Sequence, residues 1–157
     1  ILYMPYDDHD LSLLFASSLM RPYYGQLNPF ITCTSPSTYI QNNPNLKSSK
    51  GYESMFCYTL FDDYMLTVDY LYDKDLWTDF VLPIDDMTRT YTDNYGNSHA
   101  LDISLFISQS LFKNYWNFSV EAAFGYVSTR GAVCDRKIDF NDLSYGVTVK
   151  SNLALSK

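Results

Sequence analysis

The sequence predicts an all-β protein: a transmembrane segment of an antiparallel β-barrel with about six meandering strands. Three observations predict this fold class. Six stretches alternate apolar with small or polar residues at period two, as expected of a strand with two different faces. Short and long connections alternate between these stretches. Aromatic residues gather near both ends of the stretches, which is typical of a barrel in a lipid bilayer.

Each of the six stretches has one mostly apolar face. In the fourth, Leu101, Ile103 and Leu105 alternate with Asp102 and Ser104. Each stretch has about ten residues, which matches the ~9–11 residues that a tilted strand needs to cross a bilayer. We therefore expect strands over residues 11–20, 52–60, 64–73, 100–111, 116–127 and 145–156.

The connections divide into two kinds. Residues 5–10, 61–63 and 112–115 form short turns, whereas residues 22–50, 73–99 and 129–142 form long connections. Irregular loops of this length are uncommon in compact soluble domains, where connections usually have about 4–6 residues. Short periplasmic turns opposite long extracellular loops are typical of transmembrane β-barrels. We therefore expect long irregular loops at one end of the strands.

Aromatic placement separates a barrel from a soluble β-sandwich or lipocalin, because those folds also have one apolar face per strand. Amphipathic rings at both ends of an aliphatic band indicate a lipid-facing surface. The aromatic residues at the short-turn end are Tyr3, Tyr6, Phe61, Tyr64, Phe112, Tyr115 and Trp116. Those expected at the long-loop end are Tyr23, Tyr24, Tyr52, Tyr72, Tyr126 and Tyr145.

Composition excludes two classes of protein. The net charge is −7 and no cluster of Lys and Arg is present, so a nucleic-acid partner is not expected. No apolar run reaches the ~18 residues of a membrane-spanning helix, so a helical membrane protein is also excluded.

The chain starts at Ile1 and ends in mid-pattern. We therefore expect residues 1–157 to be part of one outer-membrane β-barrel domain, with the plug and the remaining strands outside this sequence.

The stretch "RPYYGQLNPF" and the following "PSTYIQNNPNLKSSKGYE" resemble the outer membrane protein beta-barrel family, whose barrels are like those of TonB-dependent receptors. The later "GNSHALDISLFISQSLFKNYWNFSVEAAFGY" is also similar to the loop, strand and turn pattern of these barrels. Asn42 stands where the family usually has Gly, and Ser48-Ser49 where Pro-Glu is common. The matching residues are Arg21, Pro22, Tyr24, Leu27, Asn28, Pro29, Phe30, Tyr39, Asn43, Pro44, Asn45, Leu46 and Lys47.

The resemblance implies a protein of the Gram-negative outer membrane that binds a ligand and transports a nutrient. It implies a large barrel, of about 22 strands in the outer-membrane transporters, with a plug inside. The implied partners are outer-membrane lipid, the remaining strands and plug of the same chain, an energy-coupling inner-membrane protein and a surface lipoprotein. Two alternatives stay open: an outer-membrane barrel with a structural or adhesion role, and a soluble β-sandwich that binds carbohydrate.

Loop aromatics are the candidate ligand-binding residues, because loops on a rigid scaffold often carry binding. They are Tyr23, Tyr24, Phe30, Tyr39 and Trp77. The alternative is that these rings only pack the loops against the barrel rim. For Trp77 the two interpretations are equally supported; for the other four rim packing is favoured.

Other polar groups suggest no catalysis. We expect Glu53, Asp69, Asp73, Asp102, Glu121 and Lys150 to line a hydrated lumen, with contact to a solute or plug as the alternative. No P-loop, nucleophile elbow or Ser/His/Asp arrangement is present, so neither an enzyme nor a cofactor is expected. No metal site is expected at "DDHD" (residues 7–10) or at Asp135, Asp139 and Asp142. The cysteines lack metal or redox spacing, although Cys33 and Cys134 both lie in predicted loops and a pairing stays open.

Overall fold

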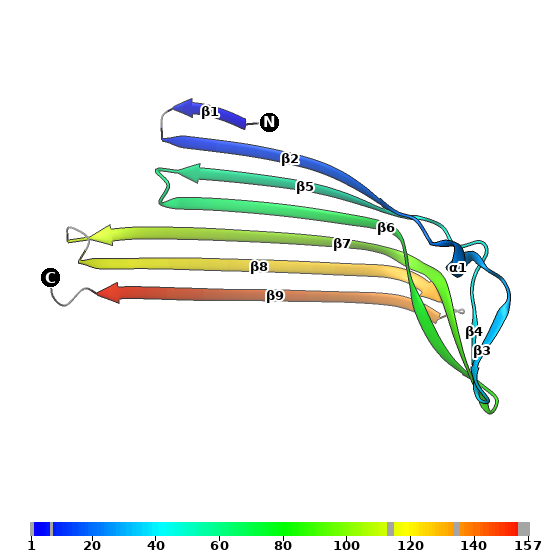
Figure 1. The fold of residues 1–157 in the computed structure, drawn as a ribbon. Coiled ribbons are helices and arrows are strands. Elements are labelled where there is room, and N and C mark those ends of the chain that lie inside the picture. The colour runs from blue at the N-terminus through cyan, green and yellow to red at the C-terminus, as the bar shows by residue number, and fades with distance from the viewer. Residues whose placement is uncertain (1, 7, 113–114, 134–135, 154–157) are drawn as a thin grey trace.

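The computed structural model describes residues 2–6, 8–112, 115–133 and 136–153, and in this part of the chain the strands form one nine-stranded sheet (Figure 1). No helix in these ranges is long and apolar enough to span a membrane. The elements in chain order are β1 (Leu2–Tyr6), β2 (His9–Met20), α1 (Tyr24–Leu27), β3 (Ile31–Ser35), β4 (Thr38–Gln41), β5 (Ser49–Leu60), β6 (Tyr64–Ile84), β7 (Met87–Leu111), β8 (Trp116–Val133) and β9 (Arg136–Leu153).

The predicted meander is confirmed. The six predicted strands correspond to β2, β5, β6, β7, β8 and β9, and each pairs antiparallel with the next in this order. The structure adds β1 beside β2, and the hairpin of β3 and β4, of which β4 pairs parallel with β7. The sheet is open, as expected of a segment cut from a larger barrel.

The short connections are tight turns, and we call this side of the sheet the turn end. β5 stops at Leu60 and β6 starts at Tyr64, with a hydrogen bond from the Asp63 amide to the Leu60 carbonyl of 3.2 Å. Phe61 and Asp62 have φ angles of 53° and 55°. Asp tolerates this left-handed region better than most residues do, which explains Asp62 in this turn.

Two of the three long connections are not irregular loops, and that prediction was wrong. β6 and β7 continue as a paired ribbon to a turn at Asp85 and Asp86, and β8 and β9 pair out to Val133 and Arg136. Among the described residues of these three connections, irregular segments occur only between β2 and β5, together with α1 and the β3–β4 hairpin. We call this side of the sheet the loop end.

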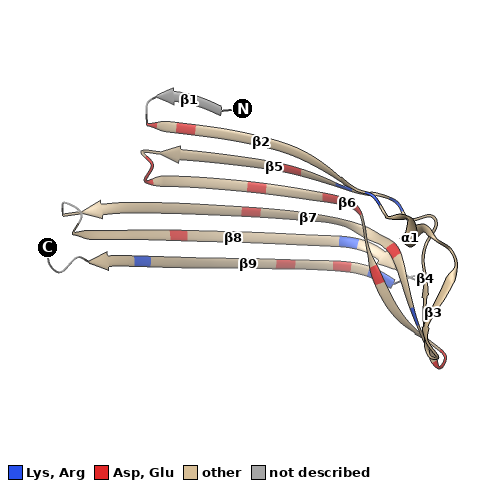
Figure 2. Ribbon diagram, in the orientation of Figure 1, with Lys and Arg blue, Asp and Glu red and all other residues tan. Residues whose placement is uncertain are grey.

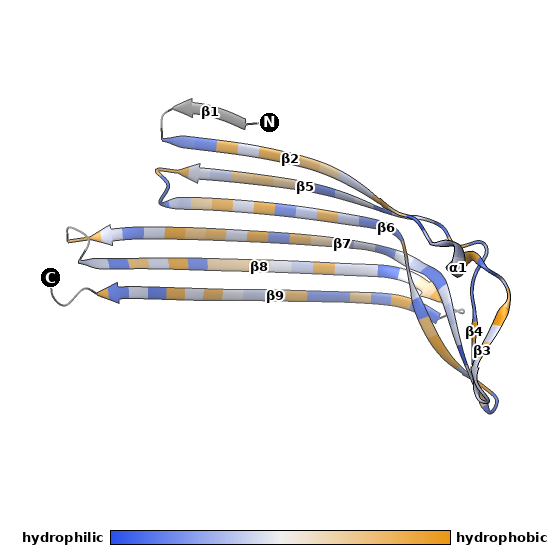
Figure 3. Ribbon diagram, in the orientation of Figure 1, coloured by the Kyte–Doolittle hydropathy of each residue, from blue (hydrophilic) through white to orange (hydrophobic). Residues whose placement is uncertain are grey.

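The strand register assembles the apolar faces into one continuous surface, the apolar band. Directly paired residues of an antiparallel sheet place their side chains on the same face. One row of the band is Leu11, Tyr58, Leu66, Leu105, Ala122 and Val147. The next row faces the other way and is Ser12, Cys57, Thr67, Ser104, Ala123 and Gly146. Figure 3 shows this alternation along the long strands.

Nothing in the described chain covers the apolar band. The buried hydrophobic residues there are only Leu46, Tyr91 and Val133, and none of them belongs to the band. Leu105 stays 41% exposed although it has a paired strand on each side. A soluble β-sandwich buries such a face against a second sheet, whereas a transmembrane barrel turns it to lipid. The band is therefore the lipid-facing surface and the opposite face is the lumen wall.

Aromatic rings border the band at the loop end. Tyr52 stacks on Tyr72 with ring centroids 6.2 Å apart, and Tyr72 stacks on His99 at 4.6 Å. The Tyr70 hydroxyl lies 2.7 Å from Nδ1 of His99. Tyr145 was also expected here, but it pairs with Phe124 within the band because β9 begins as early as Arg136.

A second aromatic border lies at the turn end. His9 Nδ1 is 2.6 Å from the Tyr58 hydroxyl, and Phe112 stacks on Trp116 at 6.5 Å. The Trp116 indole Nε1 donates a hydrogen bond of 2.8 Å to Ser151 Oγ. Rings with one polar atom suit the membrane–water interface. The side chains of Tyr3 and Tyr6, which were also expected here, lie outside the described residues.

Candidate binding site at the loop end

The loop end carries an ordered structure that we call the extension: residues 76–84 of β6, residues 87–96 of β7, and the β3–β4 hairpin beside them. Figure 1 shows β6 and β7 bending away from the other long strands at this point. The pairing of β6 with β7 shifts register between Asp73 and Trp77, which is a β-bulge or a similar irregularity. Bulges bend a strand and increase its twist, so this irregularity directs the extension away from the barrel wall.

Two paired glycines lie where β7 enters the extension. Gly96 pairs with Gly131 of β8 and has a φ of 152°, a conformation that other residues rarely adopt. A Cβ at Gly96 would lie 2.0 Å from the Arg130 carbonyl oxygen, and one at Gly131 would lie 1.5 Å from the Tyr95 carbonyl oxygen. The two backbones therefore approach too closely for any side chain at either position.

The connection between β2 and β5 is held against the extension by asparagine side chains. The Asn94 amide accepts a hydrogen bond from the Lys47 amide N–H at 2.8 Å. It donates to the carbonyls of Lys47 at 3.1 Å and Asp75 at 2.6 Å. Asn43 Nδ2 donates to Asp93 Oδ1 at 2.8 Å. The "NPNL" segment, predicted to turn the chain back toward the barrel, does turn here, at Pro44 and Asn45.

Removing the Asn94 amide should loosen this attachment. Asn94→Ala leaves the three backbone groups that it contacts without their partner, and we expect the segment before β5 to lose about 1–3 kcal/mol of local stability. Hydrogen exchange of the amides of residues 45–50 in the full-length protein measures the effect. Asn152→Ala is the matched control, because the Asn152 side chain has no hydrogen bond to the described residues. Equal protection in both variants would contradict the assigned role of Asn94.

A cavity of about 270 Å³ lies between the start of α1 and the extension. Its lining offers hydroxyl, amide and carboxylate groups beside one aromatic ring. Asn42 Nδ2 donates to the Gly25 carbonyl at 2.8 Å, and Thr92 Oγ1 donates to Asp79 Oδ1 at 2.5 Å. These contacts orient polar groups around the cavity, as ligand sites require. The lining residues are Tyr23, Gly25, Thr32, Ile40, Asn42, Asp79, Thr90 and Thr92.

The five aromatic candidates from the sequence lie in different surroundings. Tyr23 lines the cavity, whereas Tyr24 in α1 is 87% exposed and is not among the lining residues. Phe30 is exposed before β3. Tyr39 pairs with Arg89, so it lies on the face of the extension opposite to Ile40 and the cavity. Trp77 is half-buried, and its indole Nε1 has no hydrogen-bond partner among the described residues.

The cavity residues Asp79, Thr90 and Thr92 were missed because residues 73–99 were expected to be an irregular loop. A signal for them is present in the sequence. Thr88, Thr90 and Thr92 alternate along β7, and the "DD" at 85–86 repeats the turn chemistry of "FDD" at 61–63. Asp85 has a φ of 51°, as Asp62 has 55°. Two polar residues between alternating segments therefore indicate a second hairpin.

The face opposite to the cavity has its own aromatic cluster. Phe80 packs against Tyr91 with ring centroids 5.7 Å apart, and the Arg89 guanidinium lies 4.7 Å above the Tyr91 ring. The rings of Tyr95 and Phe80 lie nearly perpendicular to each other, with centroids 6.2 Å apart. Burial, and to a smaller extent the negative charge of Asp73, raise the pKa of the Tyr95 hydroxyl. The Tyr95 phenol is thus neutral over the physiological range, and this cluster stabilises the extension on which the cavity is built.

The lumen face carries the predicted acids. By strand alternation Glu53, Asp69, Asp73, Asp102, Glu121 and Lys150 all lie on the face opposite to the band. Asp69 and Asp102 are directly paired, and glycine at 125 leaves room for a carboxylate, since a Cβ there would lie 2.8 Å from Asp102 Oδ1. The wall of the lumen is therefore acidic along these strands.

Within the described ranges no group of three or more His, Cys, Asp or Glu side chains is placed to hold a metal ion. Asp139 and Asp142 lie on opposite faces of β9, because they pair with Arg130 and Val127 respectively. Cys33 and Cys57 are free thiols. Asp7, Cys134 and Asp135 lie outside the described residues, so the open cysteine pairing is not tested.

The comparisons with known proteins agree with this geometry. The sequence matches the family described as "Outer membrane protein beta-barrel family" over residues 1–157. Among solved structures the chain is similar to the siderophore receptor PirA from Pseudomonas aeruginosa, with a TM-score of 0.59 and 13% sequence identity. The similarity covers 99% of this chain and 35% of the receptor chain, so this sequence spans about a third of that protein. No curated protein matches the sequence.

Proposed function

The chain belongs to the outer membrane protein beta-barrel family, and from this premise we propose that it is part of a receptor barrel that binds a ligand at the cell surface and imports it across the outer membrane. The observation that carries the proposal is the polar cavity at the loop end. Long connections of outer-membrane barrels lie on the extracellular side, so this cavity faces the medium.

The surroundings of the cavity support capture of a small, neutral, hydroxyl-rich ligand. Threonine hydroxyls and the Asn42 amide both donate and accept hydrogen bonds, while the Asp79 carboxylate accepts them. The ring of Tyr23 adds an apolar surface against which the carbon side of such a ligand packs. Because Asp79, Thr90 and Thr92 lie on paired strands, their polar groups are placed before the ligand arrives, which lowers the entropic cost of binding.

The same strands support a route into the lumen. β6 and β7 run without interruption from the extension to the turn end, and their lumen faces carry Asp69, Asp73 and Asp102. A ligand released from the cavity therefore meets a hydrated wall rather than an apolar one. In the proposed receptor a plug inside the complete barrel gates this route, and an energy-coupling inner-membrane protein drives its opening. The likeness in fold to a siderophore receptor supports the import class without naming the cargo.

Uptake by cells tests the proposed function. Cells with and without the full-length gene are grown in a defined medium of small sugars and polyols, and the depletion of each compound is followed by mass spectrometry. We expect one compound to be depleted only by cells with the gene, and an uncoupler of the inner membrane to stop this uptake. If both strains depleted every compound equally and cells without the gene differed in adhesion, the proposed import function would be wrong and a structural or adhesion role would take its place.

Two neighbouring tyrosines provide a matched test of the cavity. Tyr23→Ala should weaken binding of the imported compound by about three- to tenfold, because it removes the aromatic wall of the cavity. Tyr24→Ala should leave binding nearly unchanged, because this side chain is in solvent. Isothermal titration of the purified full-length protein measures both constants. A larger effect of Tyr24→Ala would place the ligand elsewhere on the loops.

A further inference from the structure

Two lysines lie side by side on the lipid-facing surface just beyond the aromatic border of the loop end. Lys50 of β5 pairs directly with Lys74 of β6, in the row that follows the Tyr52–Tyr72 pair on the same face. Both side chains are exposed. Like charges directly opposite each other destabilise a sheet. Neither lysine has a carboxylate partner among the described residues, in which Arg130 and Asp139 form the ion pair.

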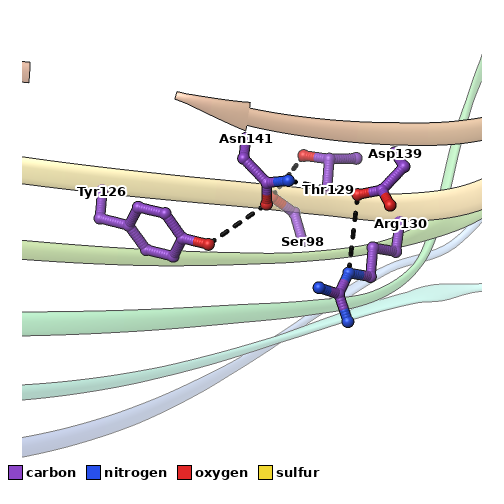
Figure 4. A network of polar contacts seen from close by, with 6 residues as sticks. All are labelled: Ser98, Tyr126, Thr129, Arg130, Asp139 and Asn141. Atoms are coloured by element: carbon purple, nitrogen blue, oxygen red, sulfur yellow. Dashed lines mark hydrogen bonds and ion pairs between the residues drawn. The ribbon is translucent and has the colours of Figure 1, made fainter. Parts of the chain in front are cut away.

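At the same end of this face, polar residues of β7, β8 and β9 form a belt across the sheet. Asn97 of β7 pairs with Arg130 of β8, and the Arg130 Nε lies 3.7 Å from Asp139 Oδ1 of β9 (Figure 4). Asn141 Nδ2 donates to the same carboxylate oxygen at 3.3 Å and Asn141 Oδ1 accepts from the Tyr126 hydroxyl at 3.2 Å. Figure 2 shows both basic and acidic residues at this end of the sheet. The belt lies where lipid headgroups meet the barrel.

An apolar groove lies directly below the two lysines, toward the middle of the band. Phe15, Tyr52 and Tyr70 border it, while the small side chains of Ser17 and Ser54 leave it open. Its volume is about 410 Å³. Ser54 pairs with both Phe15 and Tyr70, so the groove crosses β2, β5 and β6 on the lipid-facing surface. A recess between aromatic rings at this depth has the shape and polarity that an acyl chain fills.

We propose that this surface binds one phosphate-bearing lipid of the outer leaflet specifically, with its phosphate on Lys50 and Lys74 and an acyl chain in the groove. A phosphate between the two ammonium groups replaces their repulsion by two charge-assisted contacts. The cation pair and the groove lie on the same two strands, in the vertical order of a lipid headgroup and its chain. The proposal does not depend on the imported compound, and a failure of the uptake experiment leaves it unchanged.

Lipid retention by the full-length protein tests the lysine pair. The protein is reconstituted in phosphatidylcholine nanodiscs with or without phosphatidic acid, extracted into detergent, and its bound lipids are counted by native mass spectrometry. Each lysine near a membrane surface raises the affinity for anionic lipid roughly fivefold. We therefore expect Lys50→Gln with Lys74→Gln to lower phosphatidic acid retention roughly thirtyfold. The double Arg variant should retain the lipid, and Lys150→Gln, which changes a lumen-facing charge, should have no effect.

Filling the groove separates a bound lipid from a bound anion. Ser54→Leu keeps the surface apolar and the lysines in place. It should reduce the retention of phosphatidic acid without changing the amount of phosphatidylcholine in the surrounding bilayer. Inorganic phosphate at millimolar concentration should not displace the lipid. Displacement by inorganic phosphate, or retention that is the same in the wild type, the double Gln variant and Ser54→Leu, would overturn the proposal.

Discussion

Replacing Leu105 by arginine is expected to destabilise the assembled barrel by about 2–4 kcal/mol, the cost of a lipid-facing charge near the bilayer midplane. Leu105 lies in the apolar band, midway between His99 and Leu111 of β7, where it pairs with Leu66 and Ala122. No described residue covers this face, so the guanidinium would meet hydrocarbon. Unfolding of the full-length protein by guanidinium chloride in lipid vesicles measures the loss, and heat-modifiable migration of membrane extracts reports the assembled fraction in cells.

The neighbouring residue is the matched control for this substitution. Ser104 belongs to the same strand but faces the lumen, where it pairs with Thr67 and Ala123. Ser104→Arg places the same charge at the same depth in water, and we expect a loss below about 1 kcal/mol, as for most exposed substitutions. If Ser104→Arg proved the more damaging variant, the apolar band would face inward, and the fold would not be a membrane barrel.

The strands that cross the membrane could be predicted because lipid imposes a visible pattern on the sequence. Each lipid-facing position must be apolar while each lumen-facing position can be polar, so period two shows residue by residue. Outside the membrane neither face of a strand has to be apolar. Residues 76–96 therefore alternate less clearly, with Thr88 and Thr90 next to Arg89, and the sequence predicts an irregular loop for them. The parallel pairing of β4 with β7, which helps to order them, is nonlocal and has no local signature.

The difference between membrane-spanning strands and the segments outside the membrane also explains what could be predicted of the two candidate sites, the lysine pair and the cavity. The pairing of Lys50 with Lys74 follows from the tight turn at 61–63, because a turn of known length sets the register of its whole hairpin. The cavity brings together Tyr23, Asn42 and Asp79 from three separate segments. Whether these three residues come together depends on the bend of the extension at the register shift beyond Asp73. It also depends on the nearby pair of Gly96 and Gly131. Of the five aromatic candidates, the structure brings only Tyr23 to the cavity, because the other four lie on a different face, in solvent or beside the barrel.

Gly131→Ala is expected to detach the extension from β8 and to abolish ligand capture. The added Cβ would lie 1.5 Å from the Tyr95 carbonyl oxygen, so the backbones of β7 and β8 must separate at this point. Overpacking of this kind costs about 1–3 kcal/mol even where side chains give way, and here the obstacle is backbone. Hydrogen exchange of residues 77–95 measures the loosening, and ligand binding measures its consequence for the cavity.

The barrel itself should survive this substitution, because the clash lies at its rim. The next lumen-facing pair, Ser98 and Thr129, is joined by a hydroxyl contact of 3.0 Å, and every pair from there to Leu111 and Trp116 keeps regular register. Gly146→Ala is the control: it faces the lumen and a Cβ there meets nothing within 4 Å. It should leave both exchange and binding unchanged. Faster hydrogen exchange in both variants would mean that the backbones of β7 and β8 do not approach closely at Gly96 and Gly131. Unchanged ligand binding by Gly131→Ala would mean that ligand capture does not require the extension.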